Sequence, residues 1–152
     1  MHLFGAHAEG VIRGGRPGDV IAVRDGAILR ATVDGAVWIT HLKAAAGDEP
    51  TLKLPAAQVL GDALAGVPER PLALDAPENG PTWRELRYEE RGPVGVLHFA
   101  FHNGAMSTAQ CARLREALAH ARSRPTRVLV LAGGPDFWSN GIHLNAIEAT
   151  GR

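Results

Sequence analysis

The sequence predicts a mixed chain of α+β or α/β class in two parts, a small β-barrel followed by a strand–helix–strand unit. Short β-rich runs separated by Asp-Gly pairs fill the first part. A proline-rich stretch follows, and an apolar strand–helix–strand pattern ends the chain. We place the three parts at 1–66, 67–82 and 83–152.

The composition is that of a soluble globular protein, with 45% hydrophobic and 21% charged residues in 152. No apolar run reaches the roughly 18 residues of a spanning helix, and the N-terminus lacks a secretion signal. The net charge is zero and the only lysines are Lys43 and Lys53, which argues against a nucleic-acid partner. The single cysteine, Cys111, fits a reducing cytoplasm. We therefore expect a cytoplasmic protein that binds neither membrane nor nucleic acid.

The first part, 1–66, has the pattern of a β-meander. Tight hairpin turns are predicted at Asp25-Gly26 and Asp34-Gly35, because glycine, and aspartate tolerably, accept positive φ. These turns separate three β-rich runs, VIAVR, AILRAT and AVWITHL. The sequence RPGD at 16–19 predicts a turn before the first run, and 51–64 predicts a strand and then a short helix.

The histidines of this part do not predict a metal site. His2 and His7 are too few and too loosely placed, since a site needs three or four convergent ligands. His41 beside Trp38 is expected to be a half-exposed strand residue. Residues 67–82 hold four of the ten prolines and predict an extended connector.

The second part, 83–152, predicts two strands around the turn RGPVG, then a helix and a third strand. Ser107 and Gln110 form a capping box at the start of the helix, and Pro125 ends it. Arg113 and Glu116 are expected on its solvated face, and Cys111 as a small core residue. The buried stripe is predicted at Leu114, Ala117, Leu118 and Ala121. The apolar run RVLVLAG predicts a parallel strand buried on both faces.

Two irregular loops, 101–107 and 133–144, follow the strands at the sheet edge where ligands bind in open α/β folds. Gly141 would turn the chain so that the amide of Ile142 points into the loop crevice. Such an amide is a donor for a developing oxyanion. Ser139 or Asn140 could cap a following helix. The alternative is a plain turn with a capped helix, and the spacing by itself favours that alternative.

The residues VGVLHFAFHNGAMSTAQCARLREALAHA and RVLVLAGGPDFWSNGIHL resemble the opening of the crotonase (enoyl-CoA hydratase/isomerase) fold. The version DFWSNGIHLNAIEA is similar to the hydrogenase-maturation family known as HypX or HoxX. The first part agrees, because PGDVIAVRDGAILRATVDGAVWITHLK looks like the small OB-like barrel at the C-terminal end of methionyl-tRNA formyltransferases. HypX joins these modules in this order, and the resemblance covers about residues 2 to 149.

The resemblance implies a function in making carbon monoxide for the iron of a nickel–iron hydrogenase. A folate-binding domain passes a formyl group from formyl-tetrahydrofolate to coenzyme A, and a crotonase-like domain decarbonylates formyl-CoA. By position, Gly141 and Ile142 match the first half of the oxyanion hole. Residues matching the loops that line coenzyme A are Gly104, Ala105, Met106, Ser139, Asn140 and Leu144. His143 stands where most crotonases carry an aspartate.

The resemblance also implies that the chain is a piece of a larger enzyme and inactive by itself. The folate-binding domain, the second amide donor and the acid/base residue belong to other segments, and Glu148 follows the wrong loop for that role. The partners implied are the hydrogenase maturation machinery and the remainder of its own fold. The rival interpretations are an enoyl-CoA hydratase/isomerase fragment and a non-catalytic interaction module.

Overall fold

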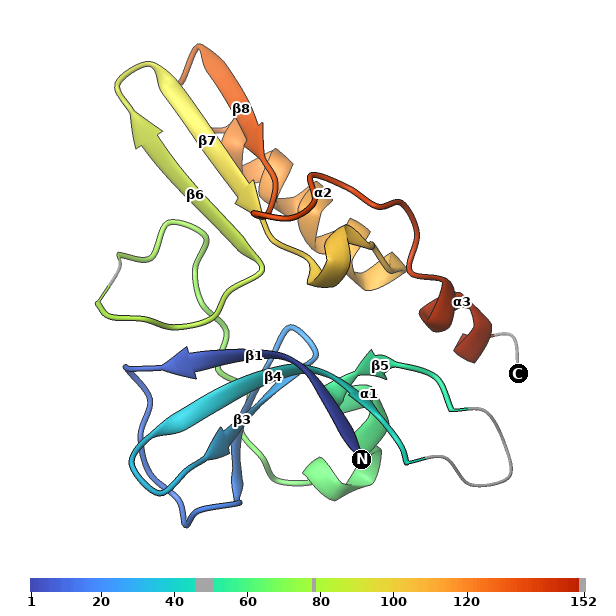
Figure 1. Ribbon diagram of the computed structural model, residues 1–152. Coiled ribbons are helices and arrows are strands. Elements are labelled where there is room, and N and C mark those ends of the chain that lie inside the picture. Colours follow the sequence, from blue (N-terminus) through green and yellow to red (C-terminus); the bar gives the residue numbers. More distant parts are fainter. Residues whose placement is uncertain (46–50, 78, 151–152) are drawn as a thin grey trace. The chain divides into compact units, whose positions relative to one another are not determined.

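Strands dominate the first half of the chain, where β-branched and apolar residues are separated by turn-forming pairs, as the computed structural model shows (Figure 1). The structure describes residues 1–45, 51–77 and 79–150, so that 46–50, 78 and 151–152 of the predicted parts lie outside the described residues. Two units are present, one of Met1–Pro71 with 79–83 and one of Leu72–Pro77 with 84–150. Each unit has its own sheet and its own core.

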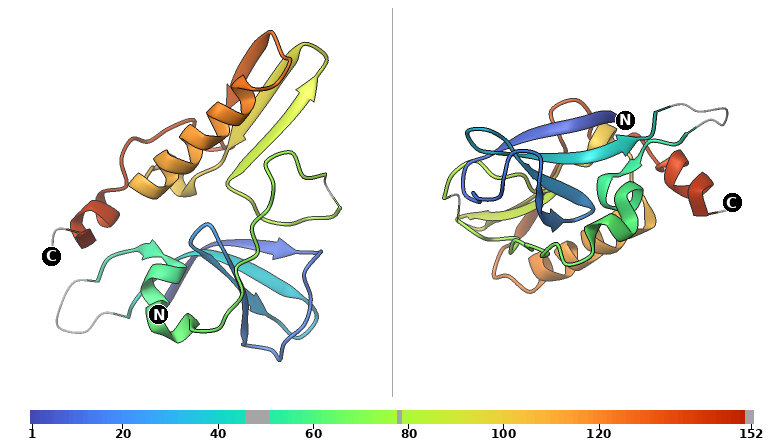
Figure 2. Two further views of the ribbon diagram at one scale, coloured as in Figure 1. Left: turned by 180° about the vertical axis from the view of Figure 1, so that it is seen from behind. Right: turned by 90° about the horizontal axis from the view of Figure 1, so that it is seen from below.

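The first unit is built on a five-stranded antiparallel sheet. Its strand order is β1-β4-β3-β2, and β5 pairs with β4. A short helix, α1, and a 3-10 turn, η1, follow the last strand (Figure 2). The elements are β1 (His2–Glu9), β2 (Val20–Arg24), β3 (Ala27–Ala31), β4 (Ala36–Lys43), β5 (Leu54–Pro55), α1 (Ala56–Leu60) and η1 (Gly61–Leu64).

The three predicted strands are confirmed as β2, β3 and β4, and the predicted strand and short helix as β5 and α1. The Asp25-Gly26 hairpin is confirmed too, with φ of 49° and 83°. The Asp34-Gly35 prediction is wrong in its geometry. Ala31 pairs with Ala36, so residues 32–35 all belong to the turn. The Thr32 amide closes this turn on the Gly35 carbonyl at 2.9 Å, without positive φ.

The core of the first unit surrounds Trp38, which is fully buried with Leu29. The carboxylate of Glu9 is buried beside it and accepts a hydrogen bond from Trp38 Nε1 at 2.5 Å. The guanidinium of Arg24 lies over the same ring, 4.5 Å from its centroid. His41, predicted half-exposed, is only 3% exposed, because it lies on β4, which pairs with strands on both sides.

The proline-rich segment is not a free connector along its described length. Pro68 and Arg70 bond to the backbone of Val23 at 3.0 and 2.8 Å, within the first unit. Residues 72–77 belong to the second unit, where the Leu74 carbonyl accepts from Tyr88 at 2.8 Å. Residues 79–83 return to the first unit. The prolines therefore lie in segments that are hydrogen-bonded to the folded units, and not in a free linker.

The second unit has a three-stranded sheet in the order β6-β7-β8. The β6–β7 pair is antiparallel and the β7–β8 pair is parallel, as predicted. The helix α2 lies along one face of this sheet (Figure 2). The elements are β6 (Leu86–Arg91), β7 (Val94–Phe99), η2 (His102–Gly104), α2 (Thr108–Arg122), β8 (Val128–Ala132) and α3 (Leu144–Thr150).

The predicted stripe of α2 packs on the sheet. Ala117 and Ala121 are buried against Tyr88 and Leu97, with Leu114 and Leu118 beside them. The capping box is confirmed, since the Ser107 amide donates to Gln110 Oε1 at 2.9 Å. Two expectations for α2 are wrong. Arg113 forms an ion pair with buried Glu85. Cys111 is exposed, although it lies three residues before Leu114 of the stripe.

The strand β8 differs from its prediction, because it is not buried on both faces. Val128, Val130 and Leu131 are 55%, 43% and 40% exposed. The strand forms one edge of the described sheet, pairing with β7 alone. An apolar sequence of the kind found inside parallel sheets therefore stands at an open edge.

Candidate functional site

The two loops that follow β7 and β8 lie against each other at one end of the sheet. Three backbone hydrogen bonds join them. The amide of Asn140 donates to the Gly104 carbonyl at 2.8 Å, the amide of Met106 to the Gly141 carbonyl at 2.9 Å, and the amide of His143 to the Met106 carbonyl at 2.9 Å. Residues predicted for the site from separate stretches are thus brought together.

The first loop turns sharply at Asn103 and Gly104, whose φ values are 55° and 65°. Asparagine and glycine are the residues that tolerate this left-handed region best. Gly104 is also closely approached, since a Cβ there would lie 2.5 Å from Cβ of Phe137. The site therefore requires glycine at this position for backbone conformation and for space. Ala105 follows the turn in an extended conformation.

The second loop presents the amide of Ile142. Met106 and Ile142 form an isolated parallel bridge. In this bridge the Met106 amide donates to Gly141 and the Met106 carbonyl accepts from His143, the two residues on either side of Ile142. Backbone groups alternate in direction along an extended chain, so the N–H of Ile142 points away from Met106. Gly141 has φ of 77°, and a Cβ on it would meet nothing within 4 Å. The amide is outside the loop ladder, and the residue before it, Gly141, has open space at its Cβ position.

The cap of α3 is not the one predicted. His143, 5% exposed, accepts a hydrogen bond at Nδ1 from the Ala146 amide at 3.2 Å and so begins the helix. Ser139 Oγ instead accepts from the Gly141 amide at 3.3 Å, and Asn140 bonds through its backbone. Imidazole is a less common cap than serine or asparagine, which is why the sequence pattern favoured those two. Leu144, the first helical residue, is 68% exposed.

Trp138 shapes the second loop together with Phe99 of β7, and neither residue was assigned a role from the sequence. Trp138 meets Phe99 edge to face, with centroids 5.4 Å apart, and its indole N–H donates to the Leu131 carbonyl at 3.3 Å. A Cβ on Gly133 would lie 2.5 Å from Cα of Trp138, so the loop folds back tightly on the end of β8. The Gly-Gly pair at 133–134 was the sequence signal for this close approach.

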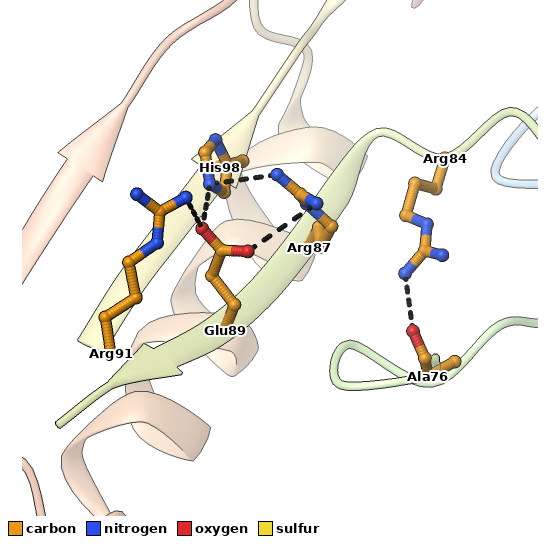
Figure 3. Close-up of polar contacts among 6 residues, drawn as sticks. All are labelled: Ala76, Arg84, Arg87, Glu89, Arg91 and His98. Atoms are coloured by element: carbon orange, nitrogen blue, oxygen red, sulfur yellow. Dashed lines mark hydrogen bonds and ion pairs between the residues drawn. The ribbon is translucent and has the colours of Figure 1, made fainter. Parts of the chain in front are cut away.

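A charged cluster lies on the side of β6 and β7 away from α2 (Figure 3). Glu89 accepts from Arg91 at 2.6 Å and lies 3.2 Å from His98 Nε2 and 3.6 Å from Arg87. The hydrogen bond from His98 lowers the pKa of Glu89 against the opposing effect of burial, and Arg91 and Arg87 lower it further. Arg84, drawn nearby, donates to the Ala76 carbonyl at 3.1 Å. This cluster lies on strands, apart from the two loops.

Other kinds of site were sought among the described residues. In that part of the chain, no group of three or more His, Cys, Asp or Glu side chains could hold a metal ion. Within the same residues, no helix is both long and apolar enough to cross a membrane.

No protein-family model matches the chain. It is 52% identical over 149 residues to the hydrogenase maturation factor HoxX of Bradyrhizobium diazoefficiens. The matched region covers 98% of this chain and 24% of HoxX. It is also similar to crystal structures of HypX from Aquifex aeolicus. A variant form matches with a TM-score of 0.91 and 47% identity over 96% of this chain and 26% of that one. The complex with tetrahydrofolic acid matches with the same TM-score and identity, covering 25% of that chain.

Sequence and structure agree on the similarity. The chain corresponds over nearly its whole length to a segment of hydrogenase maturation proteins of the HoxX and HypX type, and it spans about a quarter of their length. The two loops, with their three connecting hydrogen bonds, lie within this matched segment.

Proposed function

We propose that this chain, as a segment similar to HoxX and HypX, carries the first half of a coenzyme A thioester site in a hydrogenase maturation protein. The observation that supports this most is the Ile142 amide, which is turned away from the loop ladder beside the open space at Gly141. A backbone N–H held in this way is a preorganised donor to a carbonyl oxygen that gains negative charge.

The two units have different parts in this proposal. The first unit is an OB-like barrel of the formyltransferase C-terminal type, supported by its antiparallel sheet with hairpin connections. The second unit is the beginning of a crotonase-like domain, supported by the β7–α2–β8 arrangement and by the loops at its end. HypX of Aquifex aeolicus has been crystallised with tetrahydrofolic acid. We assign folate binding to a domain outside this chain, as the resemblance implies.

The residues of the two loops suit coenzyme A as the carrier of a formyl group. Ala105 and Ser139 have small side chains that leave room for a narrow pantetheine chain, and Gly104 forms the turn that precedes Ala105. Met106 and Leu144 offer apolar surface to it, and Leu144 is exposed. The Ile142 amide, positioned by Gly141, would polarise the thioester carbonyl, and the Asn140 side chain would offer a polar contact. Formyl-CoA would then lose carbon monoxide with help from acid/base residues outside this chain.

The proposed partners are the hydrogenase maturation machinery and the remainder of the fold, in the cytoplasm. The exposed apolar edge at β8 supports a covering segment from the longer protein, because such an edge is otherwise prone to aggregate. The same edge is the observation that favours the alternative of a non-catalytic interaction module. An enoyl-CoA hydratase/isomerase fragment would account for the second unit but not for the first.

Coenzyme A binding tests the proposal. We expect coenzyme A titrated into the chain to shift the amide NMR signals of residues 139–144, and Gly141→Pro to abolish the shifts, because proline cannot adopt φ of 77°. Gly66→Pro is the matched control, since Gly66 has φ of 81° in the first unit and similar open surroundings. A folded wild-type chain without shifts at millimolar coenzyme A would favour the interaction module.

A further inference from the structure

We propose that Glu85 is a positioning residue, which holds both ends of the loop 101–107 and through it sets the position of the Ile142 amide. The importance of Glu85 for catalysis rests on the proposed function. Its effect on the positions of the loops does not. Glu85 directly precedes β6 and is 5% exposed.

The backbone of Glu85 holds the beginning of the loop. Its carbonyl accepts a hydrogen bond from the Ala100 amide at 2.8 Å, which extends the β6–β7 ladder by one pair beyond Leu86 and Phe99. The loop therefore leaves the sheet at a fixed point, next to Phe101.

The side chain of Glu85 holds the end of the same loop. Oε1 accepts from Gln110 Nε2 at 2.7 Å, and Oε2 accepts from Arg113 on the next turn of α2. Gln110 uses its other amide atom, Oε1, to accept from the Ser107 amide at 2.9 Å. Only one orientation of the Gln110 amide satisfies both neighbours, since Nε2 donates and Oε1 accepts. The carboxylate thereby fixes the capping box where the loop enters the helix.

Backbone hydrogen bonds connect the loop that Glu85 positions to the second loop. These bonds join Gly104 and Met106 of the loop 101–107 to the second loop and lie on both sides of Ile142. A shift of the capping box would move Met106, which is adjacent to Ser107. The Ile142 amide would move with its bridge partner.

The chemistry of the position agrees with a specific role. A carboxylate buried in a protein is costly unless it is paired and hydrogen-bonded, and an apolar residue would pack a core without that cost. Glu85 has a paired cation and a second donor, and both are on the first turns of α2. The negative charge of Glu85 therefore lies beside the N-terminal turns of α2, where the loop 101–107 joins the helix.

Amide hydrogen exchange in the chain tests this role. In Glu85→Ala we expect exchange at Asn140, Met106 and His143 to become about tenfold or more faster, with less than about threefold change at Ala117, because a buried charge-assisted hydrogen bond is lost locally. Glu85→Gln keeps an acceptor for Gln110 and should restore most of the protection. Glu90→Ala is the matched control, since Glu90 is an exposed carboxylate on β6 paired with Arg124.

Two outcomes would overturn the inference. One is unchanged exchange at the three loop amides in Glu85→Ala, and the other is an equal increase at Ala117, which would mean that Glu85 serves the whole unit. If Glu85→Ala does not fold, Gln110→Ala keeps the Glu85–Arg113 ion pair and removes only the link to Ser107. Its failure to loosen the loop amides selectively, or to fold, would equally refute the role. Loosened loops in a chain that never binds coenzyme A would preserve this inference and reject the proposed function.

Discussion

The close approach at Gly104 gives the sharpest prediction for the loop pair. Gly104→Ala adds one methyl group to a residue with φ of 65°, and that group would lie 2.5 Å from Cβ of Phe137 and 3.1 Å from the Asn140 nitrogen. Cβ of Phe137 is next to the backbone and cannot swing away as the end of a long side chain can. The second loop itself would have to shift.

The magnitude follows from two separate costs. A left-handed conformation costs an alanine about 1–2 kcal/mol relative to glycine. Forcing a methyl group into occupied space costs about 1–3 kcal/mol more. We therefore expect Gly104→Ala to lower the free energy of unfolding of the second unit by about 2–5 kcal/mol.

Gly92→Ala separates the two costs. Gly92 forms the β6–β7 turn with φ of 59°, and a Cβ there would meet nothing within 4 Å. Only the conformational cost of about 1–2 kcal/mol should remain. The assay is urea unfolding followed by NMR at the amides of Leu97 and Ala117, which report on the core of the second unit. Equal destabilisation by the two substitutions would refute the close approach of the loops.

Three further predictions concern other parts of the chain. Burial would raise the pKa of Glu9, but hydrogen bonds from Thr82, Trp38 and two amides lower it below its usual value. Its stabilisation is thus present above the unfolded pKa and lost as the pH falls through the folded one, and Glu9→Gln should flatten the loss of Tm on acidification. Tyr88→Phe removes a hydroxyl that is buried without a hydrogen-bond partner among the described residues, so the free energy of unfolding should stay equal or rise by up to about 1 kcal/mol in urea titrations. Val130→Lys should reduce self-association in sedimentation velocity runs, because a charge would replace an exposed apolar side chain on the edge strand β8. Unchanged sedimentation would contradict self-association through this edge.

Local patterns predicted the elements well. The Asp25-Gly26 turn and the Ser107–Gln110 capping box each depend on residues that are neighbours in sequence, so their chemistry is visible without a fold. Burial was predicted less well, because it depends on what lies beside a strand. His41 is buried by the strands on both sides of it, whereas the apolar Val130 is exposed at an edge.

The candidate site was predicted by resemblance and by the position of its loops at the ends of parallel strands. The sequence could not show that Met106 bridges to Ile142 or that His143 caps α3, since both depend on how two distant loops meet. Glu85 was overlooked for the same reason, because its partners lie 25 and 28 positions further along the chain. The roles of the site residues in binding remain predictions.

The three tryptophans make the second loop observable by light. Trp38 is fully buried and Trp83 is 8% exposed, whereas Trp138 is 60% exposed. Emission from the first two should be blue-shifted and shielded from acrylamide, and the quenchable, red-shifted part of the fluorescence should come from Trp138. A ligand that settles between the loops would change that component alone, so the unlabelled chain contains its own optical reporter of occupancy.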